Sequence, residues 1–412
     1  MLLPVSPALL VFFGPSTTAK IPLAMLVVFV SAKLMAEAAE RLGQPGIVGE
    51  ILAGVLIGPS VLGWLAPSEF LSALSDLGAM FLLFRVGLEV KSSELLRVGG
   101  TATLVASSGV VVPFVMGTAI MLAWHAPLNE SIFVGASMVA TSVGITAQVL
   151  SAKGLLRAIS SQIILAAAVI DDVLGLLVLA VVSSLSRGKL DVPQLALTAV
   201  AAVAFTVIVA KWGTYAMGRV VPHVDSKFRV GEARFVLAMS LLFALALLAV
   251  YTGVAAIVGA FLAGLALGES TGPRERSLVQ GVSELLVPFF LAGIGLHVDL
   301  SAFGHIGTAV LALVILAAAV VSKFIGCGLG ALGLGKADAL RVGVGMIPRG
   351  EVGMVVAQIG LGFGMLSRGS YGVVVFMSVA TTIIAPPLLK MAYRSSLEAA
   401  VPEGEEETFR LG

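Results

Sequence analysis

The sequence predicts an all-α polytopic membrane protein with about 13 transmembrane helices, arranged as two inverted-topology six-helix repeats with broken crossing helices. Three observations lead to this fold class. Of the 412 residues, 58% are hydrophobic and only 12% are charged, and long apolar runs recur along the whole chain. A glycine-rich motif occurs once in each half of the chain. Spans at equivalent places in the two halves contain residues that interrupt a helix.

Apolar runs of about 20 residues place the spans along the chain. The predicted helices cover residues 19–41, 45–65, 68–90, 96–124, 129–153, 157–186, 193–221, 231–251, 254–269, 277–298, 303–334, 336–364 and 368–393. Residues 1–16 are apolar but short and contain several prolines, so they predict an extracytoplasmic or interfacial lead-in. Residues 396–412 are polar and predict a cytoplasmic tail.

Lys and Arg residues predict the orientation, because they accumulate on the cytoplasmic side of a membrane. One side of the predicted helices holds Arg41, Lys91, Arg97, Lys153, Arg157, Lys227, Arg229, Arg234, Arg274, Arg276, Lys336, Arg341, Arg394 and Arg410. The other side holds only Lys20, Arg187, Lys189 and Arg368. The N-terminus is therefore expected outside and the C-terminus in the cytoplasm.

An internal repeat predicts the architecture. Three segments of the first half match segments of the second half in the same order: 47–60 with 257–270, 81–90 with 289–298, and 138–148 with 346–358. The first pair is identical at 8 of 14 positions, and the third requires two inserted residues. Equivalent helices are seven spans apart and therefore cross the membrane in opposite senses. Many secondary transporters have such inverted repeats, with their sites near the midplane at interrupted helices.

The two interruptions fall in equivalent spans. The first contains the run TSVGIT (141–146), and the second contains Gly343, Gly345, Pro348, Gly350 and Gly353. Proline removes one backbone donor, while hydroxyls and glycines let backbone groups turn toward a cavity. A proline-kinked helix packed by small residues is the alternative, but it does not explain breaks at two equivalent places. We therefore expect an unwound-helix site supported by Thr141, Ser142, Pro348, Arg349 and Glu351.

Charged residues inside the apolar runs are the main functional candidates, because a charge at the bilayer centre costs about 2.5–3.5 kcal/mol. They are Asp171, Asp172, Lys323, Arg349 and Glu351. Neighbouring residues on a helix point about 100° apart, so one aspartate can pair with Lys323 while the other faces water. A permanently closed ion pair would need only one of them. Arg349 and Glu351 are expected to hold unwound backbone or each other in place.

The other polar residues considered are expected to have no role in transport. Glu50 and Glu89 are expected near the surface, and the four histidines show no metal-ligand spacing. The single Cys327 excludes an intramolecular disulfide and is expected to be a small buried residue.

TSVGIT followed by AAAVIDDVLG, then VSKFIGCGLGAL and VGMIPRGEVGMVVAQ, resembles the bacterial sodium/proton antiporters of the monovalent cation:proton antiporter superfamily. The two adjacent aspartates are similar to those of the electrogenic branch. The resemblance runs from about residue 20 to 393 and is carried by IDDVLG together with a downstream membrane lysine. Arg85 departs from the apolar residue that the family pattern has at this position.

The resemblance implies a homodimer with an elevator mechanism. It implies a dimerisation domain (1–95 and 226–300), a core transport domain (96–190 and 301–395), a linker helix (191–225) and the tail (396–412). In the family, the acid equivalent to Asp172 binds sodium or a proton, and the acid equivalent to Asp171 pairs with the membrane lysine, here Lys323. Asp172, Asp171 and Thr141 are thus the implied transient sodium ligands.

A buried carboxyl group has the chemistry that the exchange of sodium for a proton requires. Sodium and a proton compete for the same oxygens, and burial favours the neutral acid. We expect a secondary active transporter that exchanges Na⁺ (or Li⁺) for H⁺ by alternating access, with about two H⁺ per Na⁺ and thus electrogenic. It is expected in the bacterial cytoplasmic (inner) membrane, with lipid and the two ions as partners. No enzymatic activity, cofactor or nucleic acid is expected.

Alternatives remain open at this point. A K⁺/H⁺ antiporter of the same fold is the nearest. A Na⁺-coupled organic-anion symporter shares the inverted repeat but does not require a mid-membrane lysine. An intramembrane hydrolase would need two carboxylates on different helices or a Ser/His pair, and a channel would need a continuous polar stripe.

Overall fold

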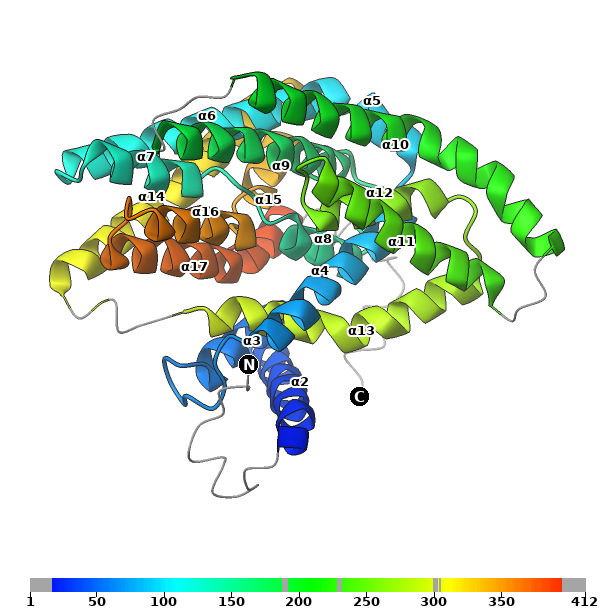
Figure 1. Cartoon of the computed structure of the whole chain (residues 1–412), viewed down its shortest axis with the longest axis horizontal. Coiled ribbons are helices and arrows are strands. Elements are labelled where there is room, and N and C mark those ends of the chain that lie inside the picture. Colours follow the sequence, from blue (N-terminus) through cyan, green and yellow to red (C-terminus); the bar gives the residue numbers. More distant parts are fainter. Residues whose placement is uncertain (1–16, 187–191, 228–231, 299–302, 304, 395–412) are drawn as a thin grey trace, which may run out of the picture.

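The computed structural model consists of α-helices and describes residues 17–186, 192–227, 232–298, 303 and 305–394 (Figure 1). The predicted lead-in and tail lie outside these ranges. Within the described residues there is no β-strand, and nine helices are long and apolar enough to cross a membrane. Shorter apolar helices complete the set, so the predicted all-α polytopic membrane fold is confirmed.

The helices fall into two repeats. The first contains α2 (Thr17–Arg41), α3 (Gly46–Ile57), α4 (Glu69–Glu89), α6 (Gly99–Ala123), α7 (Leu128–Ser137), α8 (Val143–Ala152) and α9 (Ile159–Ser186). The second contains α11 (Ala233–Tyr251), α12 (Ala256–Leu267), α13 (Pro273–Leu296), α14 (Ile306–Gly330), α15 (Lys336–Gly345), α16 (Glu351–Gly362) and α17 (Arg368–Ala392). The connecting elements are α5 (Ser92–Arg97), α10 (Val192–Lys227) and the 3₁₀ turn η2 (Leu332–Leu334).

Two predicted spans are broken as expected. The span at 129–153 is divided into α7 and α8, and the span at 336–364 into α15 and α16. The broken crossing helices are therefore confirmed at equivalent places of the two repeats.

Two other spans are shorter than predicted. The span expected at 45–65 ends at Ile57, and the one expected at 254–269 covers only 256–267. Gly58 ends α3 in an extended conformation (φ −72°, ψ 179°), because the residue before a proline, here Pro59, disfavours the helical region. These helices are shorter than a bilayer is thick, so they lie embedded among longer neighbours.

The inverted repeat is also present in the helix packing. α12 packs on α4 as α3 packs on α13. Gly54 of α3 lies against the backbone carbonyl of Ala292, and its repeat equivalent Gly264 lies against that of Phe84. A Cβ atom at either glycine would overlap backbone, so both helix pairs approach closely only because these residues are glycines.

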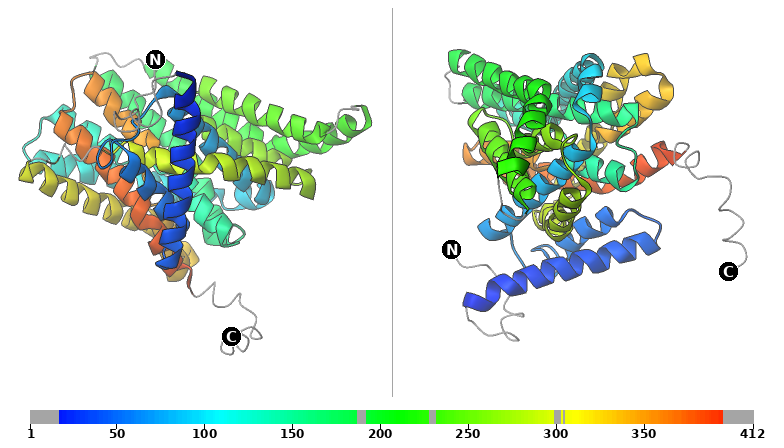
Figure 2. Two further views of the ribbon diagram at one scale, coloured as in Figure 1. Left: turned by 90° about the horizontal axis from the view of Figure 1, so that it is seen from below. Right: turned by 90° about the vertical axis from the view of Figure 1, so that its right-hand side faces the viewer.

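The helices form two bundles. α2, α3 and α4 pack with α11, α12 and α13, whereas α6 to α9 pack with α14 to α17. Figure 2 shows α2 along one side of the molecule. The assignment of these bundles to dimerisation and core transport domains stays a prediction.

Two faces of the molecule are defined by the helix ends. Lys390, near the end of α17, donates a hydrogen bond of 2.8 Å to the carbonyl of Gly43, just after α2. The ends of α2 and α17 therefore share one face, which we call the C-face. The opposite face, where α2 and α17 begin, is the N-face.

Candidate functional site at the crossing of two broken helices

The unwound segments of the two broken helices cross each other near the middle of the molecule. The backbone N–H of Ser142 donates to the carbonyl of Pro348 at 2.8 Å. The Thr146 hydroxyl donates to the carbonyl of Gly345 at 2.7 Å. A Cβ atom on Gly350 would lie 2.6 Å from the Cβ of Ser142, so a glycine is required for this approach. The two breaks thus satisfy part of each other's backbone hydrogen bonding, as a membrane interior requires.

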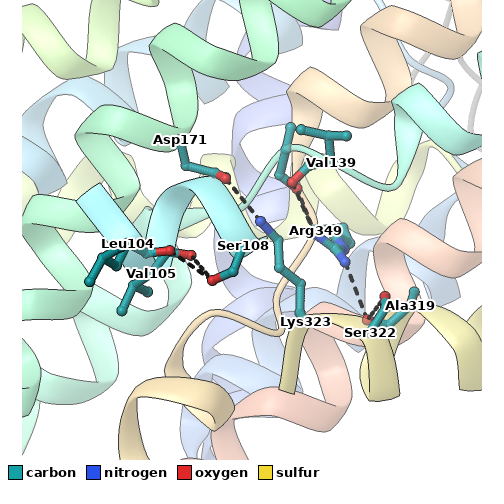
Figure 3. Close-up of polar contacts among 10 residues, drawn as sticks. Leu104, Val105, Ser108, Val139, Asp171, Ala319, Ser322, Lys323 and Arg349 are labelled. Atoms are coloured by element: carbon teal, nitrogen blue, oxygen red, sulfur yellow. Dashed lines mark hydrogen bonds and ion pairs between the residues drawn. The ribbon is translucent and has the colours of Figure 1, made fainter. Parts of the chain in front are cut away.

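Arg349 joins the crossing to the neighbouring helix α14 (Figure 3). Its side chain is fully buried, and Nη1 donates to the carbonyls of Val139 (3.1 Å) and Ala140 (3.4 Å). Nη2 donates to the carbonyl of Ala319 at 3.2 Å. The carbonyls of Val139 and Ala140 lie in the unwound segment that follows α7, and Arg349 supplies donors for them. The structure thus brings Arg349 to unwound backbone.

Asp171 and Lys323 form a buried ion pair between α9 and α14 (Figure 3). Lys323 Nζ lies 2.9 Å from Asp171 Oδ1, and both side chains have no exposed surface. Gly109 of α6 provides the space for this pair, because a Cβ there would lie 3.3 Å from Lys323 Nζ and 2.6 Å from Cys327 Sγ. The ammonium group is kept in the apolar interior by its carboxylate partner.

Asp172 has a different environment from its neighbour Asp171. Its side chain is only 4% exposed and lines a small cavity with Leu83 of α4, Val143 of α8 and Phe261 of α12. These residues come from both bundles, so Asp172 lies at the boundary between them. The two adjacent acids therefore face different surroundings, as the helical geometry predicts.

Oxygen atoms near the break suit a small hard cation. The hydroxyl of Thr141 is buried and has no hydrogen-bond partner within the described residues. Gly175, one turn after Asp171 on α9, faces Ala140, so the unwound segment runs beside the helix that carries the acids. Carboxylate, hydroxyl and carbonyl oxygens are the ligands that hard cations prefer.

The remaining candidates lie as follows. Glu351 is the first residue of α16, directly after the break, and its side chain lies outside the described part of the structure. Glu89 is exposed, as expected. The expected surface position of Glu50 is wrong: it is 5% exposed and accepts a 2.9 Å hydrogen bond from Lys33, because α2 covers the start of α3.

Sequence reasoning included Thr146 in the interrupted run 141–146 but missed the hydroxyl of Thr381. The Thr381 hydroxyl of α17 accepts a hydrogen bond from the backbone N–H of Arg349 at 3.1 Å, in the break between α15 and α16 to which Thr146 also binds. The adjacent threonines at 381 and 382, inside an apolar span, were the available signal.

Comparisons with known proteins agree on one family. The family model described as sodium/hydrogen exchanger, transmembrane, matches residues 23–394. The chain is 33% identical to the high-affinity Na(+)/H(+) antiporter NhaS3 of Synechocystis, over 95% of this chain and 93% of that protein. It is 34% identical to the Na(+)/H(+)-K(+) antiporter GerN of Bacillus cereus, over 89% and 95%. The solved structure of the sodium proton antiporter MjNhaP1 from Methanocaldococcus jannaschii shares the fold, with a TM-score of 0.63 at 19% identity, over 92% of this chain and 97% of that chain.

Proposed function

The chain belongs to the family of transmembrane sodium/hydrogen exchangers, and we propose that its exchange runs through Asp172. The resemblance found in the sequence is thereby confirmed. The protein is a multi-pass membrane transporter that exchanges sodium for protons.

The observation that carries the proposed site is the contrast between two adjacent acids. Asp171 is closed on Lys323, whereas Asp172 lines a cavity at the boundary of the two bundles. A carboxyl group in that position exchanges its proton for sodium when the cavity opens to water, because both ions compete for the same oxygens. Thr141 and Asp171 supply further oxygens during sodium binding.

The ion pair of Asp171 and Lys323 makes the transport cycle electrogenic in this proposal. When Lys323 releases its proton the pair opens, and when Lys323 is protonated again the pair closes. Two acids and one lysine then carry about two protons per sodium, so each cycle moves net charge. The proton gradient can therefore drive sodium export.

The two bundles supply the motion in this proposal. The bundle of α6 to α9 and α14 to α17 carries Asp171, Asp172 and Lys323, and it moves against the other bundle in an elevator mechanism. The other bundle forms the contact of a homodimer within the lipid. The N-face lies outside and the C-face in the cytoplasm, at the inner membrane of a bacterium, as the Lys and Arg distribution favours.

Potassium is the second candidate cation, because one relative is named a Na(+)/H(+)-K(+) antiporter. The test uses proteoliposomes with a pH dye inside, an imposed proton gradient and a potential-sensitive dye. Addition of sodium or lithium is expected to change both the internal pH and the membrane potential. A response to potassium alone favours a potassium exchanger, and a pH response without a potential change contradicts the proposed stoichiometry.

A further inference from the structure

Cavities that contain polar and charged lining residues lie on both faces of the molecule, between the two bundles. The cavity at the N-face is lined by Ser72, Ser75, Asp76, His297, Gln358 and Tyr371, among other residues. The cavity at the C-face is lined by Arg85, Glu89, Gln148, Gln280 and Glu284, among others. Helices α4 and α13 contribute to both cavities.

Equivalent positions of the inverted repeat build these two cavities. The offset of 208 residues that pairs 81–90 with 289–298 also pairs Asp76 with Glu284, and each acid follows a serine. The pairing of 138–148 with 346–358 brings Gln148 and Gln358 to equivalent positions. In each pair, one residue lines the N-face cavity and the other lines the C-face cavity. Because an inverted repeat places equivalent residues on opposite faces, the two cavities are two copies of one feature.

Both acids lie inside helices long and apolar enough to span a membrane. Asp76 is two turns into α4, and Glu284 is three turns into α13. Within the described residues neither carboxylate forms an ion pair, and Glu284 accepts a 2.8 Å hydrogen bond from Gln280 on its own helix. Both residues are exposed, and a carboxylate within a membrane-spanning helix needs water or a cation beside it. The cavity is the place where each acid meets one.

The N-face cavity adjoins the cavity of Asp172. Ile257 lines both of them. Phe290 lines the N-face cavity and Leu83 lines the Asp172 cavity. Both side chains lie beside Gly144, since a Cβ atom added to this glycine would lie 3.3 Å from Phe290 and 3.5 Å from Leu83. Asp76 therefore lies along the route from the N-face to Asp172, with an apolar barrier between.

We propose that Asp76 and Glu284 are equivalent access residues, which attract the monovalent cation at the N-face and the C-face before it reaches Asp172. This inference rests on the proposed function. A carboxylate in a cleft raises the local concentration of a cation. Asp76 is expected to have the larger effect, because it is the one acid among the described residues that line the N-face cavity, whereas Glu284 shares the C-face cavity with Glu40, Glu89, Lys33 and Arg85.

The test measures sodium-driven proton movement from each face separately. Membrane vesicles of both orientations carry the full chain, and a cleavable tag at the C-terminus identifies the exposed face. Asp76→Asn is expected to raise the KM for sodium applied at the N-face about three- to tenfold, with kcat and the C-face KM unchanged. Glu284→Gln is expected to raise the C-face KM alone, by a smaller factor. Asp76→Glu should restore the wild-type KM, and added choline chloride should reduce the difference, because salt screens exposed charges.

Matched controls separate this role from general surface charge. Glu69 begins α4 at the N-face and Glu269 follows α12 at the C-face; both are exposed and line neither cavity. Neutralising Glu69 or Glu269 should leave both KM values unchanged. Unchanged KM values in Asp76→Asn and Glu284→Gln, or equal shifts in the controls, would overturn the proposal. Loss of sodium-dependent proton movement in the wild type would instead overturn the proposed function itself.

Discussion

Lys323 on α14 and Asp171 on α9 form a 2.9 Å ion pair that is closed off from solvent. The pair links two helices of the same bundle, while Asp172, the next residue along α9, faces the boundary with the other bundle. In the proposed function, one acid holds the lysine while the other meets the transported ions.

Replacing Lys323 with leucine should abolish the change in membrane potential while some sodium/proton exchange remains, because the variant lacks the Lys323 ammonium that gains and releases a proton in each cycle. The variant should also be destabilised by about 3–5 kcal/mol, since Asp171 is left as a buried charge without its cation. The potential-sensitive dye and a melting curve in detergent check both points. Stability should return in the double variant Lys323→Leu with Asp171→Asn. A wild-type potential signal in Lys323→Leu would contradict the proposed switch.

Arg349→Ala should destabilise the protein by about 3 kcal/mol or more, because three buried carbonyls lose their charged donor. Arg349→Lys should recover only part of this stability, since an ammonium lacks the planar fork of donors. Thermal unfolding in detergent provides the measurement. Arg41→Ala is the matched control, because Arg41 forms an exposed pair with Glu37 worth about 1 kcal/mol or less. Equal melting temperatures for Arg349→Ala and the wild type would show that Arg349 does not hold the breaks together.

Gly109→Ala should impair exchange by displacing Lys323 and Cys327, whose Nζ and Sγ atoms lie within 3.3 Å and 2.6 Å of the added Cβ. Gly100→Ala on the same helix is the control, since no atom lies within 4 Å of its added Cβ. Combining Gly109→Ala with Cys327→Ala should recover activity by removing the closer contact. The sodium/proton exchange rates of these variants in proteoliposomes provide the measurement. A fully active Gly109→Ala variant would contradict the expectation and show that exchange does not require Lys323 to keep its position.

Most of the fold could be predicted from the sequence because the relevant signals are local or repeated. Apolar runs predicted the spans, and the glycine-containing segment repeated at 47–60 and 257–270 predicted the inverted repeat. Pro348 and the hydroxyl run at 141–146 gave the positions of the breaks. The lengths of α3 and α12 were overestimated, because hydropathy does not register where a helix ends within an apolar segment.

The partners of the buried polar groups could not be predicted in the same way. Arg349 reaches the carbonyls of Val139 and Ala319, about 210 and 30 residues away in sequence. Backbone carbonyls are present at every position, so no sequence pattern marks the ones that an arginine will bind. Glu50 was misplaced for a related reason, since only the packing of α2 on α3 buries it. The pairing of Asp76 with Glu284 could have been predicted, because it follows when the alignment of 81–90 with 289–298 is extended by five residues towards the N-terminus.

Sodium and protons should compete in this transporter. Lowering the pH is expected to raise the KM for sodium, because more of the site is occupied by a proton, whereas the rate at saturating sodium should change little. Sodium titrations at several pH values, made in proteoliposomes without an imposed gradient, test this expectation. A KM that stays constant while the maximal rate falls would indicate separate sites for the two ions.

The most direct test of the proposed site is sodium-driven proton movement by Asp172→Asn in proteoliposomes, compared with the wild type at equal protein density. Asparagine keeps the size of the side chain but cannot carry a proton or a charge. The predicted result is complete loss of exchange in a variant that still melts at the wild-type temperature. Exchange that persists in Asp172→Asn would contradict the assignment and place the ion carrier elsewhere in the protein.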